Sequence, residues 1–109
     1  MKRGEVWTVA GGSGYAGKPR PAVVVQDDAF ADTASVTICA FTTTTLSASF
    51  ARIAIEPSPV NGLNAPSQLM VDKVSTVPRS RLGRCVGRLS DADMARVGRA
   101  LLIFLGLAR

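Results

Sequence analysis

The fold of this chain is decided by the stretch Lys18-Pro19-Arg20-Pro21-Ala22-Val23-Val24-Val25-Gln26-Asp27-Asp28. Its centre, residues 22–25, is apolar at every position, which is typical of a strand that is covered on both faces. We therefore expect a central strand over residues 21–26, with Arg20 immediately before it. The polar residues that follow predict a connection over residues 27–32.

A second strand is expected over residues 36–43, where two sets of side chains alternate. Alternation places Thr42 on the same face as Ile38 and Ala40, so its hydroxyl lies half-buried at the end of an otherwise apolar face. An arginine fork and a hydroxyl donor at neighbouring strand ends can bind and stabilise a phosphate without a metal ion. Arg20 and Thr42 are therefore candidate catalytic residues, although both are also typical of ordinary surface strands.

The other segments predict further short strands and one helix at the end of the chain. The strand pattern indicates a small, strongly curved antiparallel sheet, which we interpret as a mainly β fold. An SH3-like barrel of about five to seven short strands with a C-terminal helix fits this pattern. The expected segments are a strand at Glu5–Val9, a mobile glycine-rich loop at 11–17, a strand at Arg52–Glu56, two strands or one bent strand at Gln68–Val71 and Val74–Val77, a helical turn at Arg79–Leu82 and a strand at Arg84–Leu89.

The terminal helix is expected to begin after Ser90, an N-cap that precedes two aspartates in the first turn, where the helix dipole favours negative charge. Its apolar run over residues 100–108 is about half of the roughly 20 residues that a transmembrane helix needs, so we expect it to be buried in protein. One face should meet the sheet and another a second subunit. The predicted apolar stripe consists of Met94, Val97, Leu101, Phe104 and Leu105.

The composition limits the classes of function. A chain of 109 residues fits one domain over residues 1–109 with a single core. Its 13 basic and 8 acidic residues give a net charge of +5, which favours a polyanionic partner such as nucleic acid or an acidic protein. Residues 1–5 show no signal-peptide pattern, so we expect a cytoplasmic protein without a membrane partner.

A zinc site and histidine acid–base catalysis are not expected. The chain has no histidine, and its two cysteines, Cys39 and Cys85, lie in separate apolar or strand-like segments. We interpret them as reduced, buried thiols. Catalysis without a cofactor must then rely on arginine, lysine, hydroxyl or carboxylate side chains.

Two other motifs are open to a second interpretation. Asp27, Asp28 and Asp32 are typical of a solvated acidic turn, the alternative being a divalent-cation site. The segment Gly12–Lys18 has the spacing of a phosphate-binding P-loop. However, Pro19 replaces the Ser or Thr that would hold magnesium and imposes an extended chain, which argues against nucleotide hydrolysis.

Several short motifs, taken in order, resemble the MazF/PemK (Kid) family of toxin endoribonucleases. Their order, spacing and extent, from residue 2 to the terminal helix, carry the resemblance. The motifs are Lys2-Arg3-Gly4-Glu5-Val6-Trp7, the stretch 20–28, Ala40-Phe41-Thr42, Asn61-Gly62-Leu63, Ser67, the stretch 71–77, Arg81-Leu82-Gly83 and Val86-Gly87-Arg88-Leu89.

The resemblance implies a homodimer of SH3-like barrels that cuts single-stranded RNA, including messenger RNA, at short sequences and arrests growth. It implies cleavage without a metal, by attack of the 2′-hydroxyl, which leaves a 2′,3′-cyclic phosphate and a 5′-hydroxyl. It also implies an acidic, MazE-like antitoxin as the restraining partner. Arg20 then corresponds to the family's acid–base and charge-stabilising arginine, and Thr42 to a threonine that hydrogen-bonds the phosphate.

The same resemblance implies a set of RNA-binding residues. Ser67, Asp72 and Lys73 match positions that contact bases, and the loop containing Lys18 matches one that closes over RNA. Thr44, in the threonine run, is a further RNA-binding candidate. Lys73 stands where many members have glutamine and offers only donors, so the cleavage sequence does not transfer.

Two alternatives remain at the level of the sequence. The first is a gyrase poison of the CcdB type, which shares the fold but needs no arginine–threonine pair and ends in a Trp-Gly-Ile motif that this chain lacks. The second is a non-enzymatic barrel that only binds RNA, for which the basic charge would suffice. Such binders usually expose several aromatic residues, whereas here Tyr15 is the main candidate for stacking and Trp7 is assigned to the core.

Overall fold

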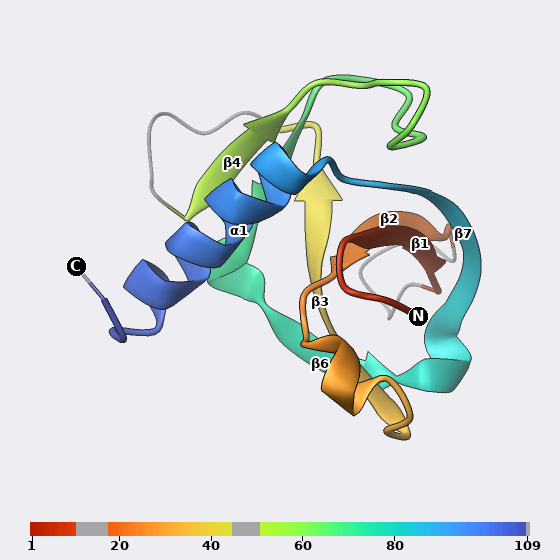
Figure 1. Ribbon diagram of the computed structural model, residues 1–109. Helices are drawn as coiled ribbons and strands as arrows, with labels where there is room; N and C mark the ends of the chain where they lie inside the picture. The colour runs from red at the N-terminus through yellow and green to blue at the C-terminus, as the bar shows by residue number, and fades with distance from the viewer. Residues whose placement is uncertain (11–17, 45–50, 109) are drawn as a thin grey trace.

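A seven-stranded antiparallel sheet and one C-terminal helix make up the fold, as the sequence predicts. The computed structural model describes residues 1–10, 18–44 and 51–108, so the predicted glycine-rich loop, the P-loop-like segment before Lys18, and Tyr15 lie outside the described residues. In Figure 1 the sheet curls around the interior of the molecule. The strands are β1 (Glu5–Val9), β2 (Arg20–Val24), β3 (Ser35–Thr42), β4 (Arg52–Ile55), β5 (Ser67–Met70), β6 (Ser75–Pro78) and β7 (Leu82–Arg88).

Strand β2 is central, as its apolar sequence predicts. It pairs with β1 on one side and with β3 on the other. Its side chains alternate between two buried clusters: Ala22 and Val24 pack with Val9 and Ile38, whereas Val23 packs into a larger core that includes the helix. Burial on both faces explains why a continuous apolar run, rather than an alternating one, is needed here.

Strand β3 has two successive partners along its other edge. Residues 35–38 pair with β6, and residues 41–42 pair with β5. A short 3-10 turn, η3 (Val71–Lys73), joins the two partners. The sequence allowed either two strands or one bent strand here, and the structure has two strands separated by a sharp turn along a common edge.

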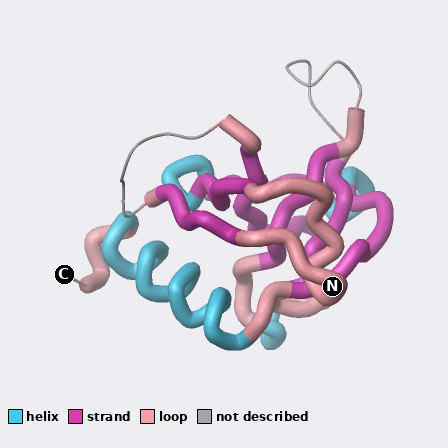
Figure 2. Tube along the Cα trace, turned by 90° about the horizontal axis from the view of Figure 1, so that it is seen from above, coloured by secondary structure: helices cyan, strands magenta, loops and turns pink. Residues whose placement is uncertain are grey.

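The helix α1 (Asp91–Phe104) begins as predicted, with the Ser90 hydroxyl accepting a hydrogen bond from the Asp93 amide at 3.1 Å. It packs against β4 and η3, and Figures 1 and 2 show it lying along one side of the sheet. Val97 and Ala100 are its buried residues. No helix in the described part of the chain has the length and apolarity needed to cross a membrane.

The predicted apolar stripe of this helix is only partly covered within the single chain. Met94 and Leu101 pack against the core, but Phe104 and Leu105 are 46% and 55% exposed. Leu102 and Leu107 are also exposed, so the apolar segment 100–108 is largely uncovered in the single chain. The reason is geometric: the last turn of α1 extends past the strands that would cover it (Figure 2).

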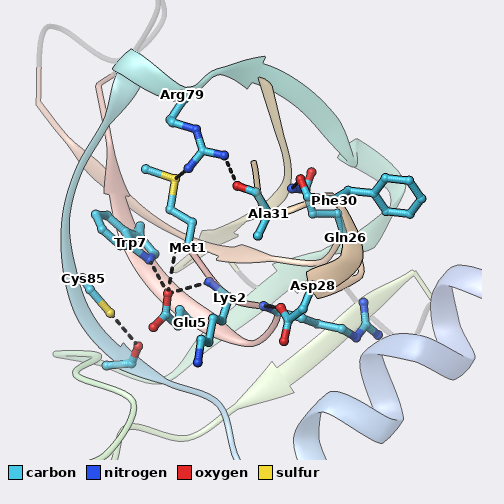
Figure 3. A network of polar contacts seen from close by, with 12 residues as sticks. Met1, Lys2, Glu5, Trp7, Gln26, Asp28, Phe30, Ala31, Arg79 and Cys85 are labelled. Atoms are coloured by element: carbon cyan, nitrogen blue, oxygen red, sulfur yellow. Dashed lines mark hydrogen bonds and ion pairs between the residues drawn. The ribbon is translucent and has the colours of Figure 1, made fainter. Parts of the chain in front are cut away.

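Two smaller predictions also need correction. Cys39 is buried and free, but Cys85 is exposed because its segment lies in β7, at the end of the sheet's strand order. Trp7 is only half-buried, and its indole nitrogen donates a hydrogen bond to Glu5 at 3.1 Å (Figure 3).

Arg79 lies in the predicted turn η4 (Arg79–Arg81). Its guanidinium donates a hydrogen bond to the Ala31 carbonyl and so holds the β2–β3 connection in place (Figure 3).

Candidate active site and RNA-binding surface

Arg20 and Thr42 lie on the same face of the sheet. Ala22 of β2 is paired with Ala40 of β3, and continuing this antiparallel register by two residues sets Arg20 opposite Thr42. Because side chains two residues apart along a strand share a face, the Arg20 and Thr42 side chains point to the side of Ala22 and Ala40. The guanidinium is exposed and the threonine half-buried, as a surface site for phosphate requires.

A recess of about 230 Å³ lies beside Arg20 on this face. Lys73, from η3, and Arg81, from η4, also line it, so three cationic side chains converge from separate elements. No carboxylate belongs to the described residues that line the recess, which makes it favourable for a phosphate. Its apolar lining consists of Val9, Ala10, Ala22, Ile38, Ala40, Met70 and Val77.

Arg81 is a member of this basic group that the sequence analysis listed in the motif Arg81-Leu82-Gly83 but did not predict as a site residue. Its backbone carbonyl accepts from the Ala10 amide at 2.8 Å, and its Nη2 donates to the Ala10 carbonyl at 2.9 Å. Arg81 therefore holds the end of β1 beside the recess. The available signal was the pair of arginines at 79 and 81 after a strand, but their separate roles depend on how η4 turns the chain.

The Thr42 hydroxyl already has one local partner. Its Oγ1 accepts a hydrogen bond from the Thr44 amide at 3.1 Å, and this bond leaves the hydroxyl proton available for donation to a ligand. Thr44 and Lys18 are both exposed near the ends of β3 and β2, respectively. Neither lines the recess of Arg20.

Ser67 lies in a different recess, of about 400 Å³. Thr43 and the two prolines that flank Arg20 also line it. Because Thr43 and Pro21 alternate with Thr42 and Arg20 along their strands, this second recess opens on the other face of the same two strand ends. The sequence-predicted residues are thus divided between two adjoining surfaces.

Asp72 is held in an ion pair. Its two carboxylate oxygens accept from Arg52 Nε at 2.7 Å and Arg52 Nη2 at 3.1 Å. The hydrogen bond from Arg52 lowers the pKa of Asp72 below its ordinary value of 3.8.

Burial, together with the nearby Asp72 charge, raises the pKa of the Cys39 thiol to about 12, so this thiol is not a nucleophile.

The predicted acidic turn has structural partners for two of its carboxylates. Asp27 caps the turn η2 (Asp28–Phe30) by accepting from the Ala29 amide at 2.8 Å, and Asp28 accepts from the Arg3 amide at 2.7 Å. Over residues 1–10, 18–44 and 51–108, no three potential metal-binding side chains gather in one place.

Comparison with known proteins identifies the family. Residues 2–105 match the family described as PemK-like, MazF-like toxin of type II toxin-antitoxin system. The chain is 55% identical over 108 residues, covering 99% of both sequences, to a probable endoribonuclease MazF of Mycolicibacterium smegmatis. It is 30% identical over 117 residues, covering 98% of both sequences, to the endoribonuclease MazF9 of Mycobacterium tuberculosis.

A solved structure agrees with these sequence relationships. It is a mycobacterial endoribonuclease in complex with its cognate antitoxin, and it matches this chain with a TM-score of 0.82 at 27% identity. The match covers 100% of this chain and 98% of that one. The chain therefore belongs to the PemK-like, MazF-like toxin family of type II toxin-antitoxin systems.

Proposed function

We propose that this chain is an endoribonuclease toxin that cleaves single-stranded RNA without a metal ion, using Arg20 and Thr42. Two observations support the proposal. Arg20 lines a recess together with two further cations, a recess that Thr42 does not line. The β2–β3 register, continued by two residues, sets Thr42 opposite Arg20. The relatives named as endoribonucleases support the reaction class.

The proposed reaction is a transesterification. As the ribose 2′-oxygen attacks the adjacent phosphorus, the 2′-hydroxyl proton passes to water. The bond from phosphorus to the 5′-oxygen breaks, and the leaving 5′-oxygen takes a proton from water. Negative charge grows on the phosphoryl oxygens, where the planar Arg20 fork and the Thr42 hydroxyl can donate hydrogen bonds. The products are a 2′,3′-cyclic phosphate and a 5′-hydroxyl, and no cofactor enters the balance.

The remaining predicted RNA contacts are part of this proposal. Lys73 lies in the recess of Arg20 and would bind a neighbouring phosphate or base, whereas Lys18 and Thr44 flank the strand ends. Ser67 offers a hydroxyl from the second recess. Asp72 retains acceptor capacity beside its Arg52 bonds, since a carboxylate has about four lone-pair sites.

The partners follow from charge and exposed apolar surface. The net charge of +5 favours an acidic, MazE-like antitoxin that associates by electrostatic steering and covers the RNA-binding surface. The exposed end of α1 favours a homodimer. A messenger RNA substrate would place the protein in the cytoplasm.

Arg20→Ala and Thr42→Ala should each lower the cleavage rate roughly 10²- to 10³-fold, because each removes a donor positioned for transition-state charge. The rate is measured on a synthetic RNA that contains a mapped cut site. Arg99→Ala is the matched control, since Arg99 is an exposed arginine on α1 and should cleave like the wild type. Equal rates for Arg20→Ala and Arg99→Ala would contradict the assignment.

The attacking group is tested with a substrate that has 2′-deoxyribose only at the cut site, in EDTA. We expect the wild type to cut the all-ribose RNA and leave the substituted RNA intact. Cleavage of the substituted RNA, or a strict magnesium requirement, would overturn the mechanism. Binding of RNA without any cut ends would favour the non-enzymatic alternative, and inhibition of gyrase without cut ends the CcdB-type alternative.

A further inference from the structure

Three of the recesses on the described surface differ in charge. The recess of Arg20 and the recess of Ser67 have no carboxylate among their described lining residues. The third, near the start of α1, is lined by Glu56, Asp91 and Asp93 together with Arg88. An RNA strand would therefore be repelled from the third recess but not from the other two.

The recess of Ser67 differs chemically from that of Arg20. Besides one cation, Arg84, its lining residues include Asn64, Ser67 and Thr43, which carry an amide and two hydroxyls, and the apolar Pro19 and Pro21. An amide offers a donor and an acceptor side by side, which suits the edge of a base rather than a phosphate. The Ser67 hydroxyl donates to the Ala65 carbonyl at 2.9 Å, so its oxygen faces a ligand as an acceptor.

The loop that carries Asn64 is rigidly attached to the sheet. The buried Asn61 side chain accepts from the Ser58 and Leu63 amides, each at 3.0 Å, and donates to the Glu56 carbonyl at 2.8 Å. A Cβ on Gly62 would lie 2.2 Å from the Val86 carbonyl oxygen, so the loop contacts β7 closely. Asn64 follows this fixed turn, which sets the position of its backbone beside the recess.

We propose that the recess of Ser67 is a nucleobase subsite in which Asn64 reads the base edge and Arg84 binds the adjoining phosphate. The proposal rests on the proposed function. The subsite adjoins the reacting phosphate, since Arg20 and Thr42 alternate with Pro21 and Thr43 at the same strand ends. Single-stranded RNA suits such a subsite, because its bases are unstacked and expose their edges.

Asn64→Ala should relax sequence preference at one nucleotide next to the cut. Cut ends are sequenced after digestion of an RNA pool randomised around a mapped site. We expect the preference at that nucleotide to fall about 10-fold, the size of a lost bidentate base contact, with preferences at the other positions unchanged. An unchanged profile, or an equal loss at every position, would overturn the role of Asn64.

Arg84→Ala tests the phosphate contact, with Arg88→Ala as the matched control. Both are exposed arginines on β7, but Arg88 lines the acidic recess. Binding is measured on RNA that carries 2′-deoxyribose at the cut site. Arg84→Ala should weaken binding several-fold and reduce the slope of log affinity against log salt by about 1, with no change in base preference, whereas Arg88→Ala should match the wild type. Equal effects of the two substitutions would overturn the phosphate contact.

These measurements separate the two proposals. If the wild type does not cut RNA, the proposed function is refuted. A selective effect of Arg84→Ala on binding of the uncut RNA would still support the subsite. Wild-type cutting with a preference that Asn64→Ala leaves intact would refute the subsite alone.

Discussion

Arg52 and Asp72 show how one residue pair shapes the site at the scale of single side chains. The Arg52 side chain is 10% exposed, and its guanidinium donates two hydrogen bonds to the Asp72 carboxylate. The pair connects β4 to η3, the turn that delivers Lys73 to the recess of Arg20. A bidentate pair fixes orientation as well as adding stability, so it positions η3 relative to the sheet.

The pair predicts a pH-dependent contribution to stability. Since the folded-state pKa of Asp72 lies below its ordinary value of 3.8, its contribution is present above about pH 4 and is lost as pH falls through the folded pKa. Asp72→Asn should lower the free energy of unfolding by about 1 kcal/mol at pH 7. Urea denaturation should show this difference shrinking as pH falls below about 4, and a difference that is constant with pH would contradict the pair's role.

At the residue scale, the sequence could identify some site residues but not others. Arg20 and Thr42 were found because each stands at the end of a recognisable strand in a family pattern. Arg81 belongs to the motif Arg81-Leu82-Gly83, and Asn64 follows Asn61-Gly62-Leu63. The sequence does not show, however, which way η4 and the 58–64 loop turn these side chains. Asp72 was predicted as a base contact, a role that stays a prediction, and its partner Arg52 lies 20 residues away.

Helix α1 is the element whose start depends most clearly on one residue. The Ser90 hydroxyl satisfies the Asp93 amide, one of the donors that a helix start leaves without an intrahelical partner. Ser90→Ala should therefore cost about 1 kcal/mol and lower the melting temperature by roughly 4–8 °C. Ser80→Ala, at an exposed serine in η4, should leave the melting temperature unchanged in the same circular dichroism experiment. Equal shifts would contradict the capping role.

Strand positions were predictable at the element scale because burial leaves a periodic pattern. The continuous apolar run identified β2, and alternation identified β3, each to within a residue or two. The break between β5 and β6 was harder to predict. Val71 and Val74 enclose the charged pair Asp72 and Lys73, and η3 turns there so that both strands can pair with one long edge of β3.

The exposed apolar end of α1 is a property of the whole molecule. Leu102, Phe104, Leu105 and Leu107 are between 46% and 71% exposed, on the same short stretch of chain. Contiguous apolar exposure of this kind is typical of an association surface. The sequence predicted that a second subunit would meet this helix, and the single chain leaves the surface available for that contact.

If the proposed homodimer forms through the exposed end of α1, Phe104→Glu should convert it to a monomer, because burial of an unpaired carboxylate in an apolar interface is unfavourable. Sedimentation velocity on the purified toxin measures the change. Val60→Glu is the control: Val60 is 58% exposed and lies near the start of α1, away from its apolar end. A monomeric wild type, or a dimer that survives Phe104→Glu, would contradict this assignment of the interface.

The sequence alone determined the strand and helix pattern, the basic charge and the family, because hydrophobic periodicity, capping and motif order are local properties of a chain. The tertiary structure decided which side chains meet. It divided the predicted RNA-binding residues between two faces of the same strand ends, brought Arg81 beside Arg20, and paired Arg52 with Asp72. These juxtapositions depend on strand register and turn direction, which long-range packing sets and which no single segment encodes.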